Sequence, residues 1–187
     1  MMTVKNLFEN EELLKNIVED LDDIPEDTKV VYDVWVLRQK ADGTVNELLL
    51  MEFNNPDDAV HLAKNWELIQ IEGAEVHYPH MSIEVETVIP NTDEDDGSTM
   101  NIGTIYRRDL LIDGEPVINE DADPTVELKK ADIEWLETGE TKVSYDLLKN
   151  FNNGDYVNLI LVDGGNYPIL YKIVSKVGEY YHCEHVL

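Results

Sequence analysis

Alternating apolar and polar positions predict short β-strands over much of the chain, and helical spacing appears in only a few stretches. Apolar residues recur every three to four positions over residues 4–21, which predicts an amphipathic helix. Residues 29–39 are rich in β-branched and aromatic side chains, and a second apolar run occupies residues 45–53. The Asp42-Gly43 turn between these two runs predicts a β-hairpin.

A helix and a second pair of strands are expected next. Asn55 suits the N-cap of a helix that runs to about Trp66, because Pro56 fits its first position. The next two residues, Asp57 and Asp58, favour the positive end of the helix dipole. Two further strands are predicted at residues 81–89 and 102–112.

The second half of the chain follows an acidic segment of weak pattern, residues 114–124, which we interpret as a linker. A short helix is predicted at residues 144–151, followed by strands at 156–162, 167–174 and 180–186. Three strands joined by short turns indicate an antiparallel meander, in a small barrel or in a sheet with a helix. We therefore expect an α+β fold of mostly antiparallel sheets with a few short helices, in two small subdomains, residues 1–113 and 114–187.

The balance of charge changes the expectation about partners. The chain has 40 Asp and Glu against 14 Lys and Arg, a formal net charge of -26, and no Lys or Arg in 65–106 or 109–128. Its hydrophobic content of 43% is that of a folded protein and not of an acidic disordered tail. Such a surface repels nucleic acid and anionic lipid and attracts basic protein surfaces. We expect a cytoplasmic location, because no apolar run approaches the roughly 20 residues of a membrane span and the single Cys183 excludes an internal disulfide.

The segment NTDEDDGSTMN, residues 91–101, places four consecutive acids between two predicted strands. A calcium loop of the EF-hand type needs oxygen ligands at fixed positions around an invariant glycine and a helix on each side. Placing Gly97 at the glycine puts Thr92 first and Gly103 last, so the ligand register fails. A solvated hairpin tip is the expectation for this segment, and loose cation binding is the alternative.

Metal-capable and catalytic patterns are weak. Cys183 and His185 alternate onto one strand face and His182 onto the other, while His77 and His80 form a separate pair without zinc-site spacing. We therefore expect Cys183 to pack as a small apolar residue. The sequence has no GxGxxG, GxxxxGK[ST], GxSxG or HExxH motif, so it nominates no nucleophile and no cofactor, and we expect no enzymatic activity.

Carboxylates are the candidate partner-binding residues. Two acids on one strand face lie about 6.6 Å apart at ~3.3 Å per residue, which is similar to the phosphate spacing along one DNA strand. This spacing permits mimicry of DNA. The candidate set is Glu84, Glu86, Asp93, Glu94, Asp95, Asp96, Glu120, Asp121 and Asp123.

The runs YDVWVL, NNPDDA, SIEVETV and NIGTIYRRDLL, within residues 30–112, resemble small acidic proteins carried by phages and mobile elements of anaerobic gut bacteria. The resemblance is to the anti-CRISPR inhibitors of type II-A Cas9. These inhibitors share no motif that transfers residue by residue, and the predicted C-terminal meander lies outside the resemblance. The resemblance implies a protein of the bacterial host cytoplasm that blocks a nuclease at its basic surface, such as the arginines that read the short duplex motif beside the target.

Three classes of function remain open. The first is a non-enzymatic acidic inhibitor, resembling DNA, that binds the nucleic-acid-binding surface of Cas9 or another defence nuclease. The alternative is an acidic protein-interaction or regulatory domain of a mobile element whose partner is not a nuclease. The third, an enzyme, requires a concave site with a perturbed carboxylate or histidine. Neither of the first two is expected to bind DNA or a membrane directly, and homodimerisation stays open for both.

Overall fold

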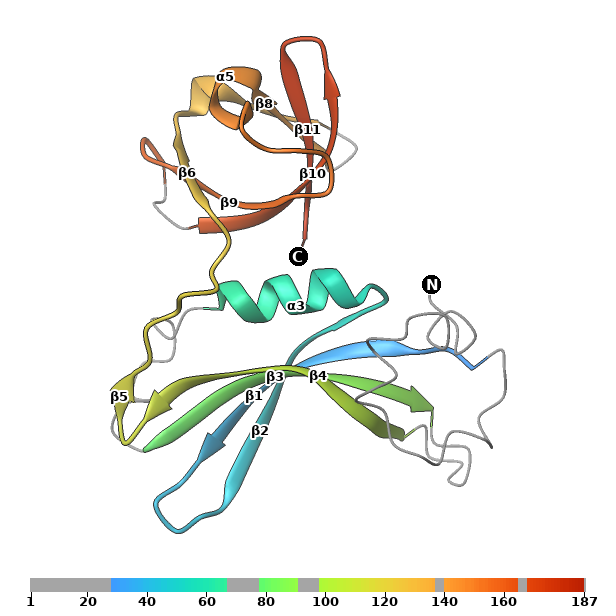
Figure 1. The fold of residues 1–187 in the computed structure, drawn as a ribbon, viewed down its shortest axis with the longest axis vertical. Coiled ribbons are helices and arrows are strands. Elements are labelled where there is room, and N and C mark those ends of the chain that lie inside the picture. The colour runs from blue at the N-terminus through green and yellow to red at the C-terminus, as the bar shows by residue number, and fades with distance from the viewer. Residues whose placement is uncertain (1–27, 67–77, 91–97, 137–139, 165–167, 187) are drawn as a thin grey trace. The chain divides into compact units, whose positions relative to one another are not determined.

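The computed structural model describes residues 28–66, 78–90, 98–136, 140–164 and 168–186 (Figure 1). The chain divides into two compact units, Met1–Glu120 and Asp121–Leu187. The helix predicted at residues 4–21 lies outside the described residues, and so do most of the acidic loop and His77.

The first unit contains a five-stranded antiparallel sheet in the order β2-β1-β3-β4-β5. Its strands are β1 (Val31–Gln39), β2 (Val45–Phe53), β3 (His80–Pro90), β4 (Thr99–Ile112) and β5 (Glu115–Pro116). The predicted hairpin is confirmed as β1 and β2, and the two later strands are confirmed as β3 and β4. In the hairpin turn, Gly43 has a φ of 87°, and Asp42 Oδ1 accepts hydrogen bonds from the backbone N–H and the hydroxyl of Thr44.

The helix α3 (Pro56–Asn65) confirms the prediction from its capping pattern, since the Asn55 side chain accepts a hydrogen bond from the Asp57 N–H at 3.0 Å. Figure 1 shows α3 lying across one face of the sheet. Its buried residues are Ala59, Leu62 and Ala63. The core on this side of the sheet consists of fully buried side chains, and Tyr32 among them lies near Asp57 of α3. These side chains are Tyr32, Val34, Val36, Ile83 and Val85.

Side chains from later in the chain close the C-terminal end of α3. Arg108 Nη2 on β4 donates to the carbonyls of Ala63 and Trp66, at 3.0 and 2.7 Å. Asn119 Nδ2 donates to the carbonyl of Lys64. These donors satisfy carbonyl groups that have no partner inside the helix.

The same contacts explain where the first unit ends. The segment interpreted as a linker is partly structured, because Glu115 and Pro116 form β5 beside the end of β4 and Asn119 is bonded to α3. The boundary between the two compact units therefore follows Glu120, whereas the sequence placed it after Asp113.

The second unit contains a six-stranded mixed sheet in the order β6-β9-β10-β11-β8-β7. Its strands are β6 (Thr125–Leu128), β7 (Ile133–Trp135), β8 (Glu140–Ser144), β9 (Tyr156–Leu161), β10 (Pro168–Val177) and β11 (Tyr180–His185). The predicted meander is confirmed as β9, β10 and β11. The pattern of the sequence did not predict the other three strands, of which β6 runs parallel to β9.

The helix α5 (Tyr145–Leu148) is shorter than the predicted residues 144–151. The chain leaves it in a turn in which the Phe151 N–H bonds to the Leu148 carbonyl and Asp155 accepts from the Asn152 N–H. The core of the unit is a cluster of buried side chains that includes Leu128, Val143, Leu148, Val157 and Ile173.

The expected α+β fold of mostly antiparallel sheets with a few short helices is confirmed in part, because the described part of the chain is predominantly β. Helical structure there consists of α3, α5 and a single 3-10 turn, η3 (Lys130–Asp132). The unpredicted strands β6, β7 and β8 are short, and their mixed side chains give little alternation to recognise. Pairing with neighbouring strands, and not local pattern, makes them extended.

A fragment of residues 121–187 should fold by itself, because its core cluster is drawn from residues 126–183. We expect a cooperative thermal transition by circular dichroism. A shorter fragment that begins at Lys129 lacks β6 and the buried Leu128, and it should lose about 3 kcal/mol of stability. If the fragment 121–187 melts without cooperativity, the two units do not fold independently.

Candidate functional site

One face of the first sheet gathers carboxylates from three adjacent strands. The register pairs Asp33 on β1 with Glu86 on β3, and it pairs Trp35 with Glu84. On β2, Glu52 lies opposite Asp33, and Glu47 lies opposite Leu37. Paired residues of antiparallel strands project to the same side, here the side away from α3. We call the five residues Asp33, Glu47, Glu52, Glu84 and Glu86 the carboxylate face.

Burial makes the centre of this face electrostatically unfavourable. Asp33 is only 6% exposed and Glu84 only 8%. Burial raises the pKa of Asp33, and the neighbouring Glu52 raises it further. Burial also raises the pKa of Glu86, with Glu84 as the next cause. The pKa of Glu84 is raised by burial as well, although Arg107 partly opposes this effect. The folded protein therefore holds these charges close together against their tendency to take up protons.

Two polar atoms on this face are buried without a hydrogen-bond partner, Asp33 Oδ1 and Trp35 Nε1. Trp35 lies directly opposite Glu84 in the register of β1 and β3. A buried polar atom without a partner destabilises a fold, and such atoms often mark a site where something binds. These two atoms lie on the same sheet face as the excess of like charge.

Positive side chains only partly compensate the five acids. Arg107 Nη1 lies 3.7 Å from Glu84 Oε2, and Lys29 Nζ lies 3.5 Å from Glu52 Oε1. The side chain of Arg107 is 60% exposed, so solvent screens its attraction to Glu84. Counted over the described residues, the carboxylate face keeps a net negative charge and can accept further positive groups.

A shallow pocket of about 290 Å³ adjoins Arg107 on this sheet. It is lined by Leu37, Gln39, Val45, His80, Met81, Ser82, Arg107 and Asp109. Serine, histidine and aspartate are the residue types of a hydrolytic triad, which requires a hydrogen bond between nucleophile and base. The hydrogen bonds found among the described residues do not join Ser82 to His80, and His80 Nε2 instead faces Asp113 Oδ1 at 3.6 Å.

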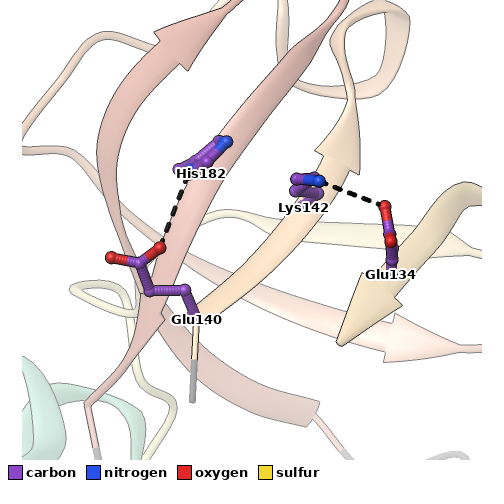
Figure 2. Close-up of polar contacts among 4 residues, drawn as sticks. All are labelled: Glu134, Glu140, Lys142 and His182. Atoms are coloured by element: carbon purple, nitrogen blue, oxygen red, sulfur yellow. Dashed lines mark hydrogen bonds and ion pairs between the residues drawn. The ribbon is translucent and has the colours of Figure 1, made fainter. Parts of the chain in front are cut away.

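The metal-capable residues near the C-terminus are dispersed by the second sheet. Cys183 is fully buried in the core, which confirms that it packs as an apolar residue. His182 lies on the opposite side of β11, with Nδ1 at 3.5 Å from Glu140 Oε2. Figure 2 shows this pair beside a second one, Lys142 and Glu134, at 3.4 Å. In the parts of the chain that the structure describes, no three His, Cys, Asp or Glu side chains are grouped to hold a metal ion.

The predicted partner-binding residues do not form one cluster. Glu84 and Glu86 share a strand face as expected, but Glu84 is buried and Glu86 half-buried. Glu120 and Asp121 are exposed at the boundary between the units, and Asp123 is half-buried. The remaining residues, Asp93, Glu94, Asp95 and Asp96, lie outside the described residues.

The sequence analysis missed three members of the carboxylate face. Asp33 interrupts the β-branched run VVYDVWV, and Glu47 and Glu52 flank the apolar run LLLM. An acid inside a strand of high apolar content was the signal available for Asp33. Its position beside Glu86 depends on the pairing of β1 with β3, which the sequence alone does not specify.

Comparisons with protein-family models, with curated proteins and with solved structures found no match to this chain. A search of the described helices for one with the length and apolar character to cross a membrane found none. The charge and geometry of the carboxylate face are therefore the basis on which a function can be assigned.

Replacing Asp33 with Asn should stabilise the protein by about 1 kcal/mol at pH 7, because the charge is removed and the shape is kept. The raised pKa means that the folded state binds the Asp33 proton more tightly than the unfolded chain does. The contribution of this proton to stability is therefore complete below the unfolded-state pKa and is lost as the pH rises through the folded-state pKa. The gain from Asp33→Asn should accordingly shrink on acidification, which urea unfolding at two pH values measures.

The matched control is Asp109→Asn, which removes an exposed charge from β4. It should change the free energy of unfolding by less than about 0.5 kcal/mol. A loss of stability in Asp33→Asn at pH 7 would show that the carboxylate makes a favourable contact, contrary to its unpartnered Oδ1.

The thiol of Cys183 should be unreactive in the folded protein. It is fully buried, and burial raises its pKa to about 12. A thiol reagent at pH 8 should label the native chain at least about a thousandfold more slowly than the urea-unfolded chain, because labelling requires opening of the core. The signal is unambiguous because the chain has one cysteine. Rapid labelling with the circular dichroism spectrum unchanged would contradict the burial of Cys183.

Proposed function

We propose that this protein is a non-enzymatic acidic inhibitor that binds the basic, nucleic-acid-binding surface of a bacterial defence nuclease, with type II-A Cas9 as the candidate target. The observation that supports the proposal is the carboxylate face, where five acids from adjacent strands meet two basic side chains from the described part of the chain. The net charge of -26 gives the whole chain the same preference for a positive partner.

A basic partner would relieve the strain of this face. Lysine or arginine side chains that approach it lower the repulsion among the carboxylates and favour their charged forms. The surface of a nuclease that holds DNA or guide RNA is rich in such side chains, because it neutralises phosphates. An acidic protein that occupies this surface excludes nucleic acid by competition, without chemistry of its own.

The exposed acids of the β1–β2 hairpin are the residues that we expect to meet the partner first. Asp42, Glu47 and Glu52 are exposed, whereas Asp33 and Glu84 are buried beneath the surface of the same sheet. The exposed acids would speed the encounter, and the buried acids would add to the local negative field. The contribution of Asp93 to Asp96 stays a prediction.

A second candidate function is a protein-interaction domain whose partner is not a nuclease. The observation that favours it is the exposed apolar strand β2, which suits a protein partner irrespective of nucleic-acid mimicry. The two candidates differ in whether binding displaces DNA.

Purified protein should compete with a target duplex for guide-loaded type II-A Cas9. Its association rate should fall steeply as salt rises from about 50 to about 200 mM, because the Debye length shortens. The double variant Glu47→Gln with Glu52→Gln should associate several-fold more slowly, since exposed charges act mainly on the association rate. Surface plasmon resonance measures both effects.

The control variant, Glu127→Gln with Glu184→Gln, removes the same charge from exposed positions of the second unit and should have the smaller effect. Binding that leaves DNA in place would favour the second candidate. Recovery of a metabolic enzyme from host lysate, with no binding to Cas9, would exclude inhibition of this nuclease.

A further inference from the structure

The strand β2 is the long terminal strand of the first sheet. It has nine residues, whereas the other terminal strands that the structure describes, β5, β6 and β7, have two, four and three. An edge strand presents a row of backbone N–H and C=O groups that another strand can pair with. The terminal strand β5 pairs only with Leu111 and Ile112, so the described part of β4 before them is a second long edge of this sheet. That edge contains Arg107 and Arg108, and charged residues of this kind protect an edge, whereas β2 has no basic residue.

Apolar side chains are exposed on both sides of β2. Val45 and Leu49 are 50% and 44% exposed and pair with Gln39 and Trp35, on the side of the carboxylate face. On the α3 side, Leu48 and Met51 are 41% and 37% exposed and pair with Val36 and Val34. Apolar residues on both sides are typical of a strand whose two faces are both covered, whereas these side chains of β2 are exposed.

Features that normally protect an edge are sparse here. β2 has no proline and no lysine or arginine, while the opposite edge of the same sheet, β5, contains Pro116. The register shift beside Val34 and Trp35 leaves Leu50 as a bulge, and it is the one irregularity between β1 and β2. The edge is therefore suited to accept a further strand.

The negative charge on β2 favours a partner segment with basic side chains. Glu47 and Glu52 flank the apolar run, both are exposed, and both belong to the carboxylate face. Lys29 lies 3.5 Å from Glu52, and the ion pairs found among the described side chains include none to Glu47. A second copy of this chain would bring two more glutamates and a further net charge of -26 to the same edge. A segment with lysine or arginine would instead pair with them.

We propose that β2 binds an extended segment of the target protein as an added strand, and that this segment alternates apolar residues with lysine or arginine. The basic character of the partner rests on the proposed function, whereas strand addition rests on the length and exposure of β2. Backbone pairing supplies the affinity, Leu48, Leu49 and Met51 take the apolar side chains, and Glu47 takes a basic one.

The test uses the full-length protein and three synthetic peptides of about nine residues, the length of β2. One alternates valine with lysine, one alternates valine with glutamate, and one is the lysine peptide with N-methylated backbone. Amide hydrogen exchange followed by NMR reports on Val45–Phe53. The lysine peptide should slow exchange in β2 by about tenfold or more, and the other two should leave it unchanged.

Two protein variants complete the test. Leu49→Lys should abolish the protection, because it replaces an exposed apolar side chain with a positive charge that repels the lysines of the peptide. Ile118→Lys makes the same change at a position that is 85% exposed outside the strands, and it should retain the protection.

If the N-methylated peptide slows amide exchange in β2 equally, strand addition is wrong, because electrostatic attraction alone would then explain the slower exchange. Protection of β2 that rises with protein concentration and without peptide would show a second copy as the occupant and would also overturn the proposal. If the lysine peptide fails while Cas9 still competes with DNA, this inference is wrong and the proposed function stands. If the peptide adds to β2 but the protein does not bind Cas9, strand addition stands and the proposed inhibition of Cas9 is wrong.

Discussion

The first unit can fold only if its apolar core offsets the repulsion among the carboxylates of β1, β2 and β3. Asp33, Glu84 and Glu86 occupy the middle of the sheet, where the side chains on the other side are fully buried under α3. Burial of Val34, Val36, Ile83 and Val85 against this helix must offset the unfavourable charge. One side of the sheet thus stabilises the fold, while the other holds charge that a positive partner can use.

Several unfavourable features of this unit lie on the same three strands. The unpartnered Asp33 Oδ1, the raised pKa values of three acids and the long exposed edge strand all belong to β1, β2 and β3. Natural proteins tend to depart from the rules of folding where a binding site requires it. The coincidence of an exposed apolar edge with a negative face favours binding of a basic protein segment over a solely electrostatic role.

The second unit follows the ordinary rules more closely. Its sheet ends in the short strands β6 and β7, and its single cysteine is buried among apolar side chains. The pairs of Figure 2, His182 with Glu140 and Lys142 with Glu134, lie across neighbouring strands, and Lys142 offsets the charge of Glu134. The charge imbalance that suggests a function is therefore best defined in the first unit.

The sequence by itself determined the elements whose signals are local. The Asp42-Gly43 turn sets the hairpin, and Asn55 with Pro56 sets the start of α3, because capping and turn geometry involve only neighbouring residues. Tertiary structure alone decided what depends on distant pairing: the strands β6 to β8, the unit boundary beyond Glu120, and the burial of Glu84. The carboxylate face is of this kind, since strand register and the bulge at Leu50 bring Asp33, Glu52 and Glu86 together.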